Sequence, residues 1–266
     1  MLGVTAVLPG SVSPYPPVIL VHGAANAAST WTFWQPELAA YGWASYAIDL
    51  RGHGRSTPVD LSTTRMQDYV VDVGSLVEQF KRPPVVLGWS MGGLVALMAA
   101  AVGMASACIA LAPSVPARQR DLSIELRTGE FGPEEYGITS RDPEAQSSMP
   151  DLDQEERSIA LSALSRESRL ARDERQAGIV IESLPCPLLL VTGTADRAWP
   201  AERYRGLWLK ADNLSVEGAS HWGLVLNRRA LATLIPAVTR WLVGAVRAEG
   251  ARGRGDGGEA PGFVGL

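Results

Sequence analysis

GWSMGG, residues 88–93, places one serine among glycines where one apolar run ends and another begins. The preceding Val85-Val86-Leu87 is typical of a short buried strand, and the run from Leu94 is typical of a helix. A sharp turn between them would strain the backbone of Ser90, and glycines at 88 and 92 suit such a turn because they bring no side chain. The helix N-terminus would offer free N–H groups to an oxyanion. This pattern predicts a nucleophilic Ser90; the alternative is a glycine turn with an incidental serine.

A serine hydroxyl needs a base to take its proton, and the chain has only three histidines. His221 follows the last apolar run, which places it at the C-terminal edge of a parallel sheet together with Ser90. His22 and His53 lie in turns next to earlier strands, where we expect them to brace loops by hydrogen bonding. His221 is therefore the predicted base.

The base in turn needs an acid that orients its ring. Asp196 follows the apolar run that ends at Val191, again at the C-terminal edge, and the order serine, acid, histidine fits a nucleophile on such a turn. Alternatively, Asp196 is an acid at a helix N-terminus ahead of Pro200. Asp49 also ends a strand, but we expect it to brace a loop with Arg51.

Short apolar runs alternate with helical patterns along most of the chain, which predicts an α/β fold with a mostly parallel central sheet and helices on both faces. The expected strands cover residues 18–21, 44–50, 85–87, 107–112, 187–191 and 214–217. The expected helices cover residues 31–41, 66–80, 202–209 and 227–246, with another beginning at Met91.

The interval 113–184 breaks this alternation. It holds about half of the 28 acidic residues and shows helical patterns near 153–165 and 168–179, without a convincing buried strand. We predict a helical cap there, inserted into a core made of residues 1–112 and 185–246. Residues 247–266 are rich in glycine and charge, which predicts a disordered tail.

Composition narrows the classes of function. A net charge of −4 and a pI near 5.5 argue against nucleic acid or an anionic membrane as the main partner, and favour a small-molecule substrate. The uncharged stretch 83–117 is long enough to span a membrane, but its prolines and glycines indicate buried core instead. Two cysteines in apolar runs predict neither a disulfide nor a metal site. Without a signal-peptide pattern, the expected location is cytoplasmic, and the oligomeric state stays open.

Five motifs in this order resemble the α/β-hydrolase superfamily, especially its small capped branch of esterases, C–C bond hydrolases and cofactor-free haloperoxidases. They are LVHG (20–23), DLRGHGRS (49–56), GWSMGG (88–93), VTGTAD (191–196) and GASHWG (218–223). The resemblance implies an oxyanion hole formed by the backbone N–H groups of Ala24 and Met91, and it implies that the interval 113–184 is the cap. Only about 17 residues precede the strand at Val18, which leaves room for one short strand or a cramped hairpin, so the presence of the usual first strand stays open.

Four tryptophans lie in or beside the expected loops at the sheet edge: Trp31, Trp89, Trp199 and Trp222. They could wall an apolar pocket or simply pack between cap and core. The leading hypothesis is a serine hydrolase that cleaves a carboxylic ester, lactone or thioester through an acyl-enzyme, without metal or cofactor. C–C hydrolysis or perhydrolysis could use the same triad, and a slow-turnover ligand receptor is a more remote alternative.

Overall fold

The structure is a computed structural model, and it describes residues 1–252. Within them, seven strands form one sheet in the order β1-β3-β2-β4-β5-β8-β9. β1 runs antiparallel to β3, whereas the other neighbouring strands are parallel. The strands are β1 (Gly3–Val7), β2 (Val18–Val21), β3 (Ser45–Asp49), β4 (Val85–Trp89), β5 (Ala107–Leu111), β8 (Leu188–Gly193) and β9 (Asp212–Val216).

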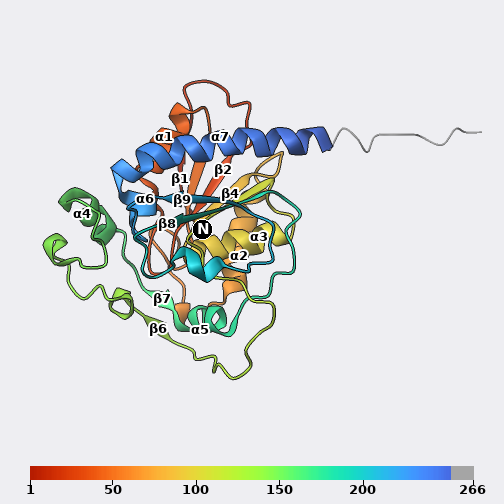
Figure 1. Cartoon of the computed structure of the whole chain (residues 1–266). Coiled ribbons are helices and arrows are strands. Elements are labelled where there is room, and N and C mark those ends of the chain that lie inside the picture. Colours follow the sequence, from red (N-terminus) through yellow and green to blue (C-terminus); the bar gives the residue numbers. More distant parts are fainter. Residues whose placement is uncertain (253–266) are drawn as a thin grey trace, which may run out of the picture.

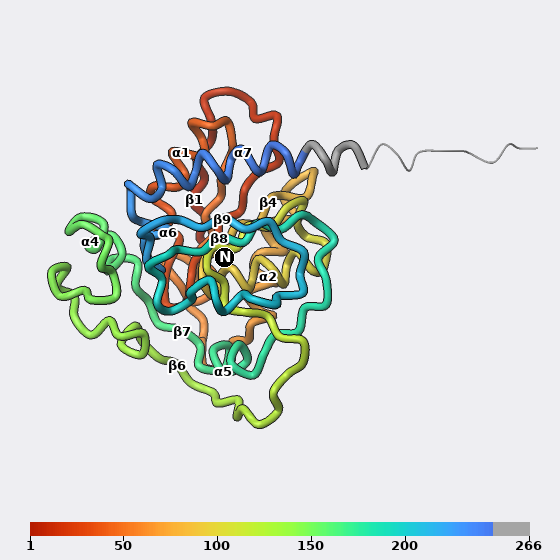
Figure 2. Tube along the Cα trace, in the orientation of Figure 1, coloured from red at the N-terminus to blue at the C-terminus, as the bar shows by residue number. Residues whose placement is uncertain are grey.

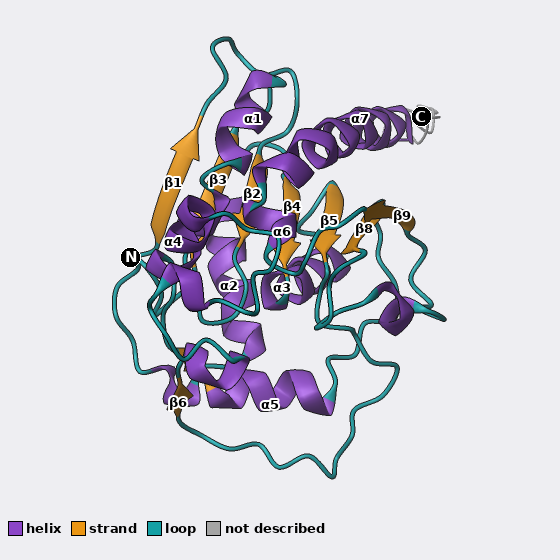
Figure 3. Ribbon diagram, turned by 60° about the vertical axis from the view of Figure 1, so that its left-hand side comes forward, coloured by secondary structure: helices purple, strands orange, loops and turns teal. Residues whose placement is uncertain are grey.

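Helices cover both faces of this sheet, as Figure 3 shows with α2 and α3 on one side and α1 and α7 on the other. The predicted α/β fold is thereby confirmed. The α-helices are α1 (Trp34–Ala40), α2 (Met66–Val77), α3 (Met91–Ala101), α4 (Gln154–Ser162), α5 (Arg169–Ala177), α6 (Gly223–Leu226) and α7 (Arg228–Arg252). Short 3₁₀ turns occupy Ala28–Trp31, Leu61–Thr63, Pro133–Tyr136, Pro143–Ala145 and Ala201–Tyr204.

Strand β2 illustrates why central strands of this sheet are apolar throughout. Val18 and Leu20 belong to the core cluster that includes α1 and α7, whereas Ile19 and Val21 belong to the cluster that includes α2 and α3. Successive side chains point to opposite faces, and a sheet covered on both sides buries both sets. All four side chains are fully buried.

One strand, β1, precedes β2 and pairs with β3 at the sheet edge, so the short N-terminal segment supplies a single strand, one of the two arrangements for which the sequence leaves room. Two other expectations need correction. The helix expected over 202–209 is only the 3₁₀ turn Ala201–Tyr204, because the chain turns at Gly206, where φ is +77°. Residues 247–252, expected in the disordered tail, belong to α7; the rest of that expected tail, 253–266, lies outside the described residues.

The segment 113–184 leaves the sheet after β5 and returns to it at β8 (Figures 1 and 2). It contains α4, α5 and two strands that were not expected, β6 (Glu130–Phe131) and β7 (Glu167–Ser168). These two pair with each other, antiparallel, and not with the central sheet. Much of the segment is irregular, so it is less helical than its sequence suggests.

By length and composition alone, the stretch Arg228–Val246 of α7 is apolar enough to cross a membrane. In the structure this helix packs over the sheet beside α1 (Figure 1), and Leu234, Ile235, Val238 and Leu242 are buried in the core. Its apolar face is that of a helix covering a sheet.

Candidate active site

Ser90 occupies the turn between β4 and α3 with φ +57° and ψ −119°, a backbone conformation that non-glycine residues rarely adopt. The glycines two places away permit it. A Cβ on Gly92 would lie 2.3 Å from the carbonyl oxygen of His22, and one on Gly88 would lie 2.0 Å from the carbonyl oxygen of Gly92. The turn is therefore so tight that the sequence at both positions is restricted to glycine.

Two backbone N–H groups next to Ser90 are candidates for an oxyanion hole. Met91 is the first residue of α3, so its N–H has no acceptor within the helix. Ala24, in the loop after β2, lines the same cavity as Ser90. Among the residues that the structure describes, neither N–H donates to a protein acceptor. Both donors are thus free to bind a ligand oxygen.

Asp196 and His221 meet at the carboxyl ends of β8 and β9. His221 Nδ1 lies 2.7 Å from Asp196 Oδ2. The other carboxylate oxygen accepts from the backbone N–H groups of Ala198 (2.9 Å) and Trp199 (2.8 Å). The Asp196 carboxylate thus combines the two roles that the sequence allows. Oδ1 caps the turn ahead of Pro200, and Oδ2 binds His221.

The charge state of Asp196 follows from these contacts. Burial alone would raise the pKa of this carboxyl, but the hydrogen bond and charge of His221, with the two backbone donors, lower it below its ordinary value. An ionised Asp196 fixes the proton of His221 on Nδ1 and leaves Nε2 as an acceptor.

Ser90 and His221 line one cavity, but they are not hydrogen-bonded in this substrate-free structure. Among the described residues, the Ser90 hydroxyl has no hydrogen-bond partner, so the expected direct contact with His221 is absent here. The ring of His221 is held by its neighbours: it lies 5.0 Å from the ring of Trp89, whose Nε1 donates to the His221 carbonyl at 3.0 Å. Catalytic hydrogen bonds of this kind often tighten only when substrate binds.

The cavity above Ser90 has a volume of about 190 Å³ and mostly apolar walls. Trp89, Trp199 and Trp222 line it, as the sequence suggested. Trp31 does not: it is fully buried in the core, where its ring packs edge-on against Trp34 at 5.8 Å. Of the two interpretations left open for Trp31, the structure therefore favours packing in the core over a place in the pocket wall.

Sequence reasoning missed the part of the wall that comes from the segment 113–184. Tyr136, Ile138, Leu164 and Arg175 all line the cavity. All but Arg175 lie outside the α-helices and strands of the segment, and no motif or periodicity in the sequence indicates that these residues approach Ser90. Among the side chains that the structure describes, no three from His, Cys, Asp or Glu are grouped as ligands for a metal ion.

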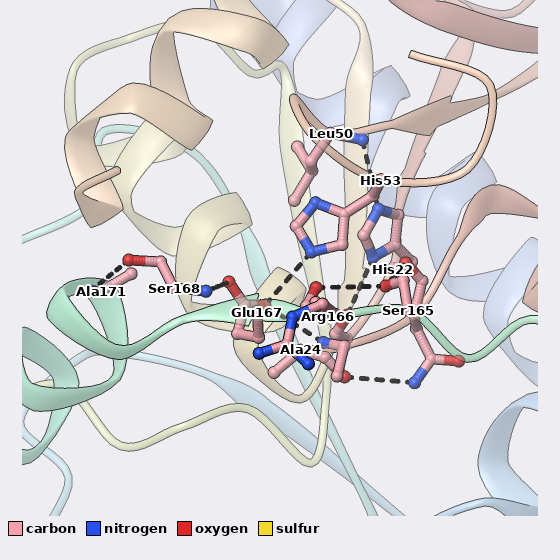
Figure 4. A network of polar contacts seen from close by, with 12 residues as sticks. His22, Ala24, Leu50, His53, Ser165, Arg166, Glu167, Ser168 and Ala171 are labelled. Carbon is pink, nitrogen blue, oxygen red and sulfur yellow. Dashed lines mark hydrogen bonds and ion pairs between the residues drawn. The ribbon is translucent and has the colours of Figure 1, made fainter. Parts of the chain in front are cut away.

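A buried polar network lies behind the loop that carries Ala24 (Figure 4). Glu167, in β7, accepts hydrogen bonds from Ala25 N–H (3.1 Å), Ser168 N–H (2.8 Å) and the hydroxyl of Tyr69 (2.5 Å). His53 Nε2 lies 3.5 Å from Glu167 Oε2, an ion-pair distance, and its Nδ1 donates to Arg51 O at 2.8 Å. The predicted bracing role of His53 therefore extends from its own loop to the segment 113–184.

His22 completes this network. Its Nδ1 donates to Gly23 O at 2.8 Å, and its Nε2 accepts from Leu50 N–H at 3.2 Å, which defines a neutral ring. Burial, and secondarily the neighbouring His53, lower the pKa of His22 to about 4. Burial would raise the pKa of Glu167, but His53, Tyr69 and Arg175 lower it to about 2. Glu167 is thus a buried anion and His22 a buried neutral base.

Two other polar side chains brace the same loop. Asp49 accepts from Ala28 N–H at 2.7 Å and pairs with Arg55 at 3.6 Å; Arg51, its expected partner, instead pairs with Asp72 at 2.7 Å. Asn26 donates to Ala24 O at 3.1 Å, so it stabilises this turn, and it also lines the cavity.

Comparison with known proteins places this geometry in a family. Residues 18–234 match the alpha/beta hydrolase family, and the chain belongs to it. It is 27% identical to the monoacylglycerol lipase of Mycolicibacterium smegmatis over 253 residues, which cover 85% of this chain and 87% of that protein. A pimeloyl-[acyl-carrier protein] methyl ester esterase of Neisseria meningitidis is 37% identical over 84 residues, 32% of this chain and 30% of that protein.

Solved structures share the fold. A soluble variant of the monoglyceride lipase of Saccharomyces cerevisiae superposes with a TM-score of 0.69 at 18% identity, covering 92% of each chain. A monoacylglycerol lipase of Paleococcus ferrophilus superposes with a TM-score of 0.59 at 21% identity, covering 92% of this chain and 99% of that one. At these identities the likeness concerns the fold.

Proposed function

We propose that this protein is a serine hydrolase that cleaves a carboxylic ester, or a related lactone or thioester, through an acyl-enzyme. The proposal rests on one observation: Ser90, with its strained backbone, lies at the N-terminus of α3 and lines the same cavity as His221, which is already hydrogen-bonded to the buried carboxylate of Asp196. Ser90, His221 and Asp196 are then the catalytic triad. The curated relatives named as a lipase and a methyl ester esterase support the same class of substrate.

In this proposal each group has one role. Substrate in the cavity brings Ser90 Oγ to His221 Nε2, which removes the hydroxyl proton as Oγ attacks the ester carbonyl. Asp196 keeps the ring in the required tautomer and stabilises the imidazolium. The N–H groups of Ala24 and Met91 donate to the oxyanion.

The second half of the cycle uses the same groups. The protonated His221 gives its proton to the leaving alcohol, and water then attacks the acyl-enzyme with His221 acting again as base. The acid product leaves and Ser90 regains its proton. C–C hydrolysis or perhydrolysis would need no other residue, so the substrate alone separates those activities from ester cleavage.

Residues 113–184 act as the cap in this proposal. They supply Tyr136, Ile138, Leu164 and Arg175 to the cavity wall and so determine which substrates fit above Ser90. Residues 1–112 and 185–246 carry the triad and the oxyanion donors.

A fluorophosphonate probe tests the proposal. It should label the wild-type protein stoichiometrically at Ser90, and a panel of chromogenic esters of increasing acyl length should be hydrolysed, with no loss on addition of a chelator. Ser90→Ala should abolish labelling and leave only a residual rate from binding and oxyanion stabilisation, roughly 10³-fold over water. Ser106→Ala removes a hydroxyl outside the cavity and should change nothing. Turnover that survives in Ser90→Ala would refute the mechanism.

A further inference from the structure

The cavity above Ser90 contains one charged side chain, Arg175 of α5. No aspartate or glutamate lines the cavity. A guanidinium in a mostly apolar wall is costly unless something offsets its lost hydration. The hydrogen-bond and ion-pair partners of Arg175 therefore show whether its charge is already compensated within the protein.

The contacts of Arg175 leave part of its guanidinium unused. Nη1 donates to the hydroxyl of Ser114 at 3.3 Å, Nη2 donates to the hydroxyl of Tyr136 at 3.1 Å, and the buried Nε has no hydrogen-bond partner. Within residues 1–252, Arg175 makes no ion pair with a carboxylate, whereas Arg169 and Arg172 on the same helix both pair with Glu135. Two neutral hydroxyls are weak partners for a cation.

Glu167 does not form an ion pair with Arg175. It is near enough that, with Tyr136, it raises the pKa of Arg175 against the opposing effect of burial. Its two oxygens, however, are taken by Ala25, Ser168 and Tyr69, with His53 at ion-pair distance. The guanidinium of Arg175 is therefore held only by the hydroxyls of Ser114 and Tyr136, and it remains open to a ligand.

Arg175 is also connected to the backbone of the proposed nucleophile. Ser114, which accepts from Nη1, donates its own backbone N–H to the carbonyl oxygen of Ser90 at 3.0 Å. One residue therefore links the guanidinium to the nucleophile. Since Arg175 and Ser90 line the same cavity, one ligand can contact both of them.

A second cavity, of about 570 Å³, continues from the first and shares Tyr136, Arg175 and Trp199 with it. It adds Arg172 and Arg203, and again no acidic residue lines it. The guanidinium of Arg203 stacks over the ring of Trp199 at 4.9 Å and has no ion pair within the described chain. Of the three arginines in this second cavity, Arg172 is paired with Glu135, whereas Arg175 and Arg203 have no carboxylate partner among the described side chains. The net charge of the protein is −4, so two uncompensated arginines in one cavity are a local exception.

We propose that the ester substrate carries an anionic group, a carboxylate or a phosphate, which Arg175 binds while Arg203 attracts it into the adjoining cavity. This inference rests on the proposed function, because it specifies the substrate of the same site. Arginine suits the role, since its planar donors match both groups.

Matched substrates test it. Nitrophenyl half-esters of dicarboxylic acids from succinate to suberate are compared with neutral nitrophenyl alkanoates of equal length, and with nitrophenyl esters bearing a terminal phosphate. The charge preference, defined as the ratio of kcat/KM for the charged ester to that for its neutral partner, should exceed about 10 at the best length. Raising the salt concentration should lower it by screening. The carboxylate and phosphate arms then tell which anion the site prefers.

Variants assign the preference to Arg175. Arg175→Gln should reduce the charge preference by about 10- to 100-fold, mainly through KM, because a hydrogen-bonded charge pair is lost. Arg175→Lys should keep part of it. Arg118→Gln is the control, since Arg118 stacks over Trp208 and lines neither cavity; it should leave the preference unchanged.

Several outcomes would overturn the inference. A charge preference near 1 in the wild type would do so. So would an Arg175→Gln protein in which kcat/KM falls equally for charged and neutral esters and the melting temperature falls as well. A protein that fluorophosphonate does not label and that hydrolyses no ester of either kind would refute the proposed function itself. Labelling with normal turnover of neutral esters but no charge preference would refute this inference alone.

Discussion

Glu167 Oε2 accepts a hydrogen bond of 3.1 Å from the backbone N–H of Ala25, 142 residues earlier in the chain. Ala25 has φ +53°, a strained value for a residue with a Cβ, and it adjoins the oxyanion donor proposed at Ala24. A buried anion from the segment 113–184 therefore holds the loop that carries the proposed oxyanion donor. On the proposed function, the cap would then support the geometry of catalysis as well as the shape of the cavity.

Glu167→Gln should weaken this support. The amide keeps the shape of the side chain but loses the charge and one acceptor, so Ala25 and Ala24 are held less firmly. We expect kcat on a neutral ester to fall by about 10- to 100-fold with little change in KM, since the loss concerns transition-state stabilisation. Steady-state kinetics and the rate of fluorophosphonate labelling measure the effect.

Glu174→Gln provides the matched control. Glu174 is another carboxylate of the segment 113–184 that bonds to the core, through Met66 N–H and Arg65. Its substitution should lower the melting temperature and leave kcat unchanged. If Glu167→Gln only lowers the melting temperature, as the control does, Glu167 has no positioning role.

Asp196→Asn should separate orientation from folding. One oxygen of the side chain can still accept from Ala198 and Trp199, but the amide cannot hold His221 in the required tautomer. We expect kcat to fall by about 10³- to 10⁴-fold at nearly unchanged melting temperature. Asp212→Asn, at the exposed bond to Trp241, serves as control. An Asp196→Asn enzyme within tenfold of wild type would remove Asp196 from the triad.

The motifs predicted the fold and the arrangement at the sheet edge because their information is local. Gly88 and Gly92 are required by contacts within a few residues or with the neighbouring strand, and the apolar runs reflect a sheet buried on both faces. His221 and Asp196 could be placed on the same edge because parallel strands all end there.

The residues that sequence reasoning missed depend on contacts over long separations. Glu167 meets Ala25 and Tyr69, and Arg175 meets Ser114, from a segment with little regular structure. No periodicity determines where such side chains point. Trp31 was left between two interpretations for a related reason: a loop position does not tell whether a ring faces a cavity or the core.

Gly92→Ala should show how tight the turn is. Alanine normally stabilises a helix relative to glycine, and Gly92 lies within α3. Here the new Cβ would lie 2.3 Å from backbone oxygens of Val21 and His22, which cannot move without disturbing β2. We expect the free energy of unfolding to fall by about 1–3 kcal/mol, measured by urea titration, together with loss of fluorophosphonate labelling. Gly10→Ala, with open space around it, is the control; a stabilised Gly92→Ala protein would contradict the tight turn.

His22 links the stability of the same loop to pH. Its ring is fully buried and neutral, with its pKa lowered to about 4 from an ordinary value of 6.5. Between these values the unfolded chain binds a proton that the folded protein does not, so the free energy of unfolding falls as the pH drops from 6.5 to 4. The difference in pKa corresponds to about 3 kcal/mol. His53 acts in the opposite sense: burial opposes its charge, but Glu167 outweighs burial and raises the pKa, so its contribution is present at low pH and lost as the pH rises.

His22→Gln removes the titrating ring while its amide can still accept from Leu50 and donate within the loop. Its free energy of unfolding should be lower than that of the wild type at pH 7, because the packing is less complete. The wild type should then lose about 3 kcal/mol more than the variant between pH 6.5 and pH 4, so that the two stability curves converge as the pH falls. Urea titrations at half-unit intervals measure both curves, with Glu167 and His53 present in each protein. Parallel curves over this range would mean that His22 binds its proton at the same pH in the folded and unfolded states. The neutral ring inferred from its bonds to Gly23 and Leu50 would then be wrong.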